Sequence, residues 1–177
     1  IFGILFLLSN LDHDKKISLP QAFLLTALSW LSIAIFGSLP FIFSEINLSA
    51  TDAFFESMSG ITTTVSTIIT NLNDTPKSIL LWRGMLQWLG GIGIIVMAIT
   101  LMPLMNIGGM QLFIISTSDT PEKILPRSKE IALRLILVYS GLTFICALFY
   151  KIFGMNFFDS IVHSMTTIAT GGFSNYN

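Results

Sequence analysis

Two short runs of threonine and glycine are the part of this sequence best suited to chemistry. The first run is TTTVST at residues 62–67, and the second is TTIATGG at residues 166–172. Carbonyl oxygens of an extended backbone can replace the hydration shell of a monovalent cation. Threonine adds a hydroxyl oxygen, and glycine allows backbone angles that a β-carbon resists. The runs therefore predict two cation-coordinating segments, although threonines can also serve plain small-residue packing between helices.

Other kinds of site are poorly represented. The single cysteine, Cys146, excludes a disulfide scaffold, and the net charge of −1 argues against a nucleic-acid partner. The glycines at 90, 91 and 93 lack the third glycine of a dinucleotide fingerprint and favour close helix packing. We therefore expect no enzyme and no cofactor. A polytopic membrane enzyme remains the alternative, and it would need a pair of ionisable groups facing a cavity.

The elements that must position the two runs belong to a membrane protein. Hydrophobic residues make up 53% of the chain and charged residues 11%, against roughly 25% charged in soluble domains. Residues 17–44, 84–118 and 135–150 carry no charge, and a bilayer span needs about 20 mostly apolar residues. We expect an all-α integral membrane protein, with spans at 19–43, 79–105 and 131–153.

A shorter apolar segment, residues 49–61, precedes the first run. It is too short to cross a bilayer, and segments of this length are typical of re-entrant or interfacial helices. Ser49 and Asp52 have the spacing of a helix N-cap. We therefore expect a half-helix that enters the membrane and an extended segment that returns. The negative C-terminal end of such a half-helix favours a cation.

The same construction recurs after a shift of 107 residues. The shift places Asn156 on Ser49, and it pairs several later positions of the half-helix and loop: Asp52 with Asp159, Ser57 with Ser164, Met58 with Met165, Ile61 with Ile168 and Thr63 with Thr170. A period of this kind indicates a repeated structural unit. The unit is a span, a half-helix, an extended loop and a second span.

These repeats divide the chain into four parts. We expect the end of a preceding transmembrane helix and a cytoplasmic loop at 1–18, a complete repeat at 19–106, a cytoplasmic connector at 107–130 and two-thirds of a second repeat at 131–177. The chain thus reads as a piece of a longer protein. Basic residues mark the cytoplasmic side, so both half-helices should enter from outside; these residues are Lys15, Lys16, Lys123, Arg127, Lys129 and Arg134.

Three long motifs resemble the TrkH family, the membrane subunits of bacterial Trk potassium uptake systems in the Trk/Ktr/HKT superfamily. They are DAFFESMSGITTT at 52–64, WRGMLQWLGGIGIIVMAITLMPLMNIGGMQL at 82–112 and FFDSIVHSMTTIATGGFS at 157–174. The resemblance implies four membrane–pore-helix–membrane repeats with re-entrant pore loops, of which about one and a half are present. It also implies potassium as the transported ion, a homodimer, a cytoplasmic nucleotide-binding gating subunit similar to TrkA, and the bacterial inner membrane.

The resemblance assigns the ion-coordinating and supporting positions of a selectivity filter. The coordinating residues would be Thr63, Thr64, Thr170 and Gly171, and the supporting residues would be Thr62, Val65, Ser66 and Gly172. Val65 stands where the family keeps a glycine. A β-branched residue at positive φ costs about 1–2 kcal/mol, so this loop must be strained or adopt another conformation. We hypothesise a weaker preference for potassium over sodium, or reduced conduction.

Three points stay open at this stage. One and a half repeats cannot enclose an axis built from four loops, so the 177-residue chain alone should be a non-conducting fragment. Arg83, at the outer end of a long span, fits a functional intramembrane charge and a side chain that snorkels to the interface equally well. His163 is expected to be a hydrogen-bonded structural histidine.

Overall fold

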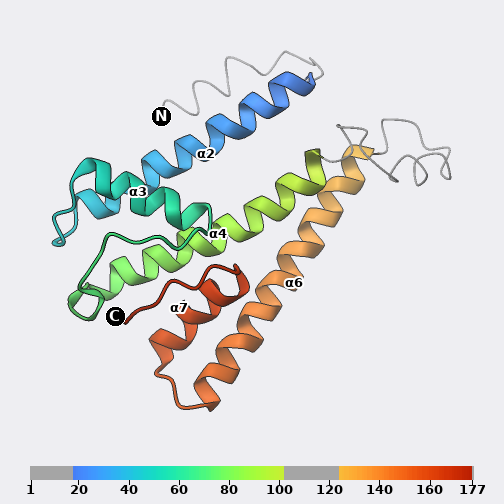
Figure 1. Cartoon of the computed structure of the whole chain (residues 1–177). Helices are drawn as coiled ribbons and strands as arrows, with labels where there is room; N and C mark the ends of the chain where they lie inside the picture. Colours follow the sequence, from blue (N-terminus) through green and yellow to red (C-terminus); the bar gives the residue numbers. More distant parts are fainter. Residues whose placement is uncertain (1–17, 102–123, 177) are drawn as a thin grey trace.

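The computed structural model describes residues 18–101 and 124–176, and all the regular elements in these two stretches are helices. In chain order they are α2 (Leu19–Ile42), α3 (Ala50–Ile61), the short 3₁₀ helix η1 (Leu72–Asp74), α4 (Lys77–Leu101), α6 (Ile124–Ile152) and α7 (Phe157–Ile168). The long helices are α2, α4 and α6, and the short helices α3 and α7 lie beside them (Figure 1). The all-α fold class is confirmed.

The three long helices are each long and apolar enough to cross a membrane. The qualifying segments are Pro20–Ile42, Lys77–Ala98 and Glu130–Ile152, which confirms the spans predicted from the uncharged stretches. Large apolar side chains on their outer faces are exposed, as expected for contact with lipid. The predicted end of the second span, 102–105, lies outside the described residues, as do the N-terminal segment and most of the connector.

The two short helices are the predicted half-helices. Each has 12 residues, and every boundary of α7 lies 107 residues after the matching boundary of α3. The Asp52 N–H donates to Ser49 Oγ (3.1 Å), and the Asp159 N–H donates to Asn156 Oδ1 (2.9 Å). These N-caps satisfy orphan backbone donors at the helix starts. The repeat proposed from the sequence is therefore present in local structure.

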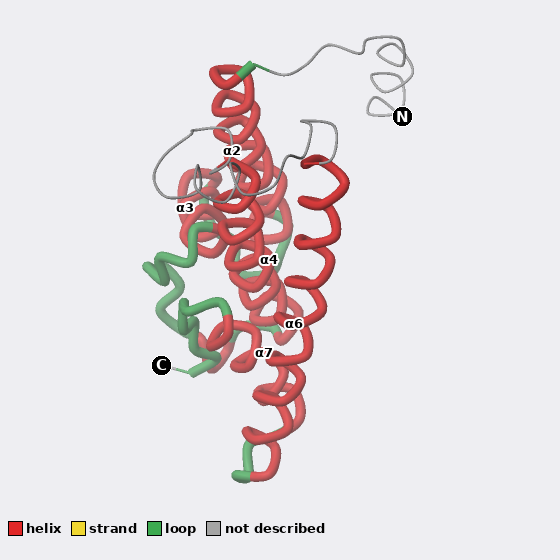
Figure 2. Tube along the Cα trace, turned by 90° about the vertical axis from the view of Figure 1, so that its right-hand side faces the viewer, coloured by secondary structure: helices red, strands yellow, loops and turns green. Residues whose placement is uncertain are grey.

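Helix α4 lies between the two half-helices. α3 packs against α2 and α4, whereas α7 packs against α4 and α6. A buried hydrophobic core between α2, α3 and α4 contains Phe41, Ala53, Ile79 and Leu86. In Figure 2 the loops that follow α3 and α7 lie on the same side of the long helices. α4 is thus the common support for both threonine–glycine runs.

Indole hydrogen bonds attach α4 to the neighbouring long helices. The Trp82 Nε1–H donates to the Gly37 carbonyl of α2 (2.9 Å), and the Trp88 Nε1–H donates to Thr143 Oγ1 of α6 (3.0 Å). Buried polar side chains need such partners, because an unpaired donor in an apolar environment is costly. These two bonds fix α4 in relation to the first helix of each repeat.

Most of the basic side chains that predict the cytoplasmic side lie outside the described part of the chain. Arg134 is described and exposed. The basic residues whose side chains lie outside the described part are Lys15, Lys16, Lys123, Arg127 and Lys129. The assignment of a cytoplasmic side therefore stays a prediction.

Candidate ion-binding site

Both half-helices end in the same hydrogen-bonded turn. After α3, the Thr63 N–H donates to the Gly60 carbonyl and the Thr64 N–H donates to the Ser59 carbonyl, each at 3.0 Å. After α7, Thr170 donates to Thr167 (3.0 Å) and Gly171 donates to Thr166 (3.1 Å). This pair of bonds is the Schellman motif, which normally places a glycine at the left-handed position. Here threonine occupies that position in both repeats.

The backbone angles of the two loops match residue by residue. Thr63 and Thr170 have φ of 57° and 58°, and two residues later Val65 and Gly172 have φ of 71° and 103°. Positive φ alternates with negative φ in both loops. In an ordinary strand successive carbonyls point to opposite sides, whereas alternation of the sign of φ allows successive carbonyls to point toward one side. Such a row of carbonyls is the arrangement that can replace the hydration shell of a cation.

The sequence left two outcomes open for the first loop, which were strain at Val65 or another conformation. The structure shows the strained conformation. The positive φ of Val65 follows that of Gly172 in the second loop, although a β-branched residue is a genuine outlier there. A Cβ built on Gly172 would meet no atom within 4 Å. The second loop therefore needs glycine for its backbone angle rather than for space.

Two adjacent glycines of α4 bring the half-helix ends to one level. A Cβ on Gly90 would lie 1.9 Å from the Ile61 carbonyl oxygen, and a Cβ on Gly91 would lie 3.0 Å from the Ala169 Cα. Glycine at these positions permits α4 to approach the backbone at the ends of both α3 and α7. The close helix packing predicted for these glycines is confirmed, and both candidate loops begin at the same height on α4.

The remaining predicted residues have distinct local roles. Thr62 caps α3, and its hydroxyl bonds to the Met58 carbonyl (2.7 Å) and to Thr64 Oγ1 (2.8 Å). Thr64 and Ser66 are exposed in the described part of the chain. Gly171 lies against α4, where a Cβ would lie 2.0 Å from a side-chain nitrogen of Gln87.

A buried ion pair holds the residues that follow the first loop, Thr67 and Ile68, against the half-helix α3. We call the residues that follow each loop its return segment. Glu56 Oε1 accepts from Arg83 Nε at 2.8 Å, and the two side chains are 0% and 2% exposed. The same carboxylate accepts from the Thr67 hydroxyl (3.0 Å) and from the Ile68 N–H (3.0 Å). Because an intramembrane charge requires such partners, Arg83 does not snorkel to the interface.

The second return segment is tied by another carboxylate, Asp159. It accepts from the Asn175 amide at 2.6 Å and from the hydroxyl of Tyr176. Asn175 lies 107 residues after Ile68, so the tethered position is equivalent in the two repeats. The position equivalent to Glu56 holds His163, whose ring stacks on that of Tyr176. The buried Nε2 of His163 has no hydrogen-bond partner among the described residues, so the expected structural hydrogen bond is not found at this atom.

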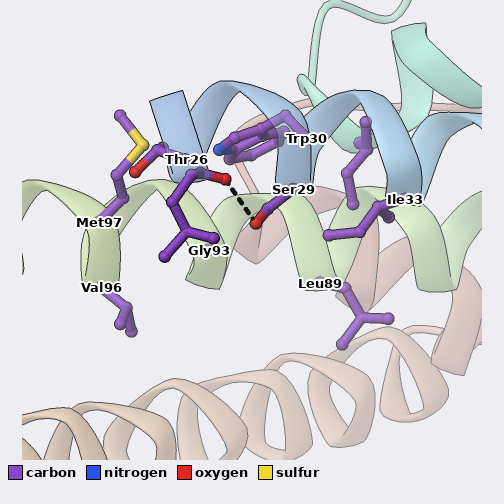
Figure 3. A pocket seen from close by; sticks show the side chains of 10 residues that line it. Thr26, Ser29, Trp30, Ile33, Leu89, Gly93, Val96 and Met97 are labelled. Carbon is purple, nitrogen blue, oxygen red and sulfur yellow. Dashed lines mark hydrogen bonds between the residues drawn. The ribbon is translucent and has the colours of Figure 1, made fainter. Parts of the chain in front are cut away.

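A groove of about 320 Å³ between α2 and α4 is unsuited to an ion. Figure 3 shows its lining, which includes Trp30, Leu89 and Met97 and contains no charged side chain. The hydroxyls of Thr26 and Ser29 donate to carbonyls of their own helix, at 2.8 and 2.7 Å. The groove is therefore an apolar surface, and the polar chemistry lies in the two loops.

Known proteins show the same combination of sequence and fold. The sequence model of the TrkH family, described as a cation transport protein, matches residues 1–177. The chain belongs to the TrkH family. The "Trk system potassium uptake protein TrkI" of Halomonas elongata is 48% identical to this TrkH-family chain over 155 residues, which is 88% of the chain and 32% of that protein. The "Trk system potassium uptake protein TrkH" of Escherichia coli K12 is 47% identical over 174 residues, 95% of the chain and 35% of that protein.

The TrkH fold is also found in a solved structure. The crystal structure of the potassium transporter TrkH from Vibrio parahaemolyticus superposes with a TM-score of 0.76 at 42% identity, covering 93% of this chain and 32% of that one. The chain thus spans about a third of the length of these relatives. It is a multi-pass membrane segment of the TrkH family.

The charge pair Arg83–Glu56 is the feature that sequence reasoning missed in this TrkH-family chain. The signal was available, because two opposite charges in otherwise apolar segments of a membrane protein tend to pair. The pair does not favour the enzyme alternative, because that alternative requires ionisable groups facing a cavity and both side chains are enclosed. The family is a transport family.

Proposed function

We propose that this chain forms part of a membrane subunit for passive potassium uptake. In this proposal, residues 62–66 and 169–172 supply two of the segments that form a selectivity filter. The observation that carries the proposal is the identical left-handed turn at the end of both half-helices, placed at one level by α4. A helix with its C-terminal end directed at the ion adds a favourable partial negative charge.

The proposed coordinating residues are Thr63, Thr64, Thr170 and Gly171. Their carbonyl and hydroxyl oxygens offer neutral ligands, which suit a monovalent cation that must bind and leave quickly. None of the four carries a charge, so a bound ion would not be trapped by a carboxylate.

The proposed supporting residues are Thr62, Val65, Ser66 and Gly172. Thr62 holds the turn through its hydroxyl, whereas Gly172 permits the backbone angle of the second loop. Val65 adopts the same kind of angle at an energetic cost of about 1–2 kcal/mol. We propose that this strain weakens the preference for potassium over sodium or slows conduction.

The proposed setting follows from the family and from the length of the chain relative to its relatives. Residues 19–106 would form one repeat and 131–177 most of a second, joined by a cytoplasmic connector at 107–130. The complete subunit would contain four repeats, form a homodimer in the bacterial inner membrane and bind a cytoplasmic TrkA-like gating subunit. The 177-residue chain alone would not conduct, and robust selective rubidium flux through liposomes holding only this chain would contradict that statement.

The test is complementation of a cell that lacks potassium uptake, using the complete reading frame that encodes this chain. Growth at low potassium should be restored. Thr63→Val and Thr170→Val, which remove a hydroxyl without changing shape much, should each reduce uptake. The matched control is Thr51→Val, an exposed threonine at the start of α3, which should leave uptake unchanged. Absence of uptake from a protein that reaches the membrane would contradict the function, and equal effects at positions 51 and 63 would contradict the site.

A further inference from the structure

Arg83 contacts segments of both repeats, although it belongs to the first. Within the first repeat its Nε donates to Glu56 (2.8 Å), and its Nη2 donates to Thr67 Oγ1 (3.1 Å). Thr67 lies in the segment that follows the first candidate filter loop. One side of the guanidinium is therefore committed to the half-helix α3 and its return segment.

The other side of the same guanidinium reaches the second loop. Its Nη1 donates to the Ser174 carbonyl at 3.3 Å, and its central carbon lies 4.2 Å from the centre of the Phe173 ring. These residues directly follow Gly172. One helical turn further along α4, Gln87 Oε1 accepts from the Phe173 N–H at 3.2 Å. α4 thus holds the second loop through two buried side chains.

The geometry of the guanidinium makes this double contact mechanically significant. Arginine presents its donors in a rigid planar fork, whereas lysine offers one nitrogen on a flexible stem. Because the contacts to Glu56 and to Ser174 use different nitrogens of that plane, the two segments cannot move independently without breaking a bond. The group is 2% exposed, so water cannot replace a lost partner.

We propose that Arg83 is a positioning residue that couples the filter loop of the first repeat to that of the second and thereby sets ion selectivity. It acts through Glu56, Thr67 and Ser174, without contacting the ion. This inference rests on the proposed function, in which the two loops belong to one filter. It extends that function by placing part of the selectivity in a charge that lies behind the filter.

The test uses Arg83→Lys in the complete protein, with Lys77→Gln as the matched control. Lys77 is an exposed residue of the same helix, and its ammonium group lies over the ring of Phe158 in α7. Hydrogen–deuterium exchange of peptides covering 62–69 and 170–175 is measured together with the ratio of potassium to sodium uptake. Arg83→Lys keeps the buried positive charge but cannot donate to Glu56 and Ser174 at the same time. Both peptides should therefore exchange about tenfold faster, as expected when a hydrogen bond to a charged group is lost, and the uptake ratio should fall severalfold.

A second variant keeps the proposal testable should Arg83→Lys fail to accumulate. The double variant Glu56→Gln with Arg83→Met removes both buried charges and so avoids an unpaired one. It should accumulate normally and still show faster exchange in both peptides with a changed uptake ratio. A purely structural role for the pair predicts wild-type exchange and selectivity in this double variant.

The outcomes separate this inference from the proposed function. Wild-type protein that carries no potassium contradicts the function, whereas the exchange data still decide whether Arg83 couples the loops. Unchanged exchange of 170–175 in Arg83→Lys and in the double variant overturns the coupling. Faster exchange of both peptides with an unchanged uptake ratio overturns the role in selectivity.

Discussion

Replacing Val65 by glycine should raise the preference of the complete protein for potassium over sodium. Val65 has φ of 71°, in the region where side chains other than glycine are disfavoured, and the equivalent residue of the second repeat is Gly172 with φ of 103°. Glycine removes the clash between the β-carbon and the backbone. The first loop can then relax toward the geometry of the second.

The size of the effect is bounded by the strain that is released. A β-branched residue at positive φ costs about 1–2 kcal/mol, and the greater freedom of glycine in the unfolded chain takes back about 0.5–1 kcal/mol. The net gain in stability should therefore not exceed about 1.5 kcal/mol. If all the strain acts on the ion site, 1–2 kcal/mol corresponds to a factor of about 5–30. We expect a severalfold rise in the uptake ratio.

Two further variants separate the backbone angle from side-chain volume. Val65→Ala keeps a Cβ at positive φ and should behave much like the wild type. Gly172→Val imposes the strain on the second loop, where a Cβ meets no atom within 4 Å, and should lower the ratio. The assay is competitive potassium and sodium uptake in cells that lack other potassium uptake, normalised to the protein present in the membrane. Equal selectivity of Val65→Gly and wild type would refute the reasoning. If Val65→Ala raised the uptake ratio as much as Val65→Gly, side-chain volume and not the backbone angle would be the cause.

Three other variants test the packing of the loops. Gly90→Ala places a Cβ 1.9 Å from a backbone oxygen of α3 and should lower the stability by about 1–3 kcal/mol or more through overpacking. The loss should appear as less folded protein in detergent. The control Gly141→Ala, whose Cβ would meet no atom within 4 Å, should match the wild type. Gly171→Ala collides with the end of the Gln87 side chain, so uptake should fall and recover partly in the double variant with Gln87→Ala; absence of any recovery would contradict this contact. Asp159→Asn should lower thermal stability by about 1–3 kcal/mol, because a buried hydrogen-bonded carboxylate is lost, and a melting curve equal to that of the wild type would contradict its tethering role.

The half-helices could be predicted because their signals are local. Ser49 and Asp52 give an N-cap, the apolar segment is too short to cross a bilayer, and the following residues are poor helix formers. The shift of 107 residues then transferred the same structure to α7. The same comparison marked Val65 as unusual, because a glycine stands at the equivalent position of the second loop, and the structure shows positive φ there.

The tertiary contacts could not be predicted because they depend on how helices rotate about their axes. Arg83 and Glu56 are 27 residues apart, and nothing local shows that they face each other. The positive φ of Thr63 and Thr170 was also missed, because threonine is not a residue that favours this region. The angle belongs to the hydrogen-bonded turn that ends each half-helix, and the ion coordination built on it remains a prediction.

The segments that follow the two loops are held by carboxylates at different positions of their half-helices, so the two repeats are stabilised differently. The first segment is held by the seventh residue of its half-helix, Glu56, and the second by the third residue, Asp159. A chimera that transplanted residues 62–69 into the second unit would meet His163 where it needs a carboxylate. The two repeats are alike in backbone shape but are held at different places, so in the proposed filter the two loops would differ in stiffness.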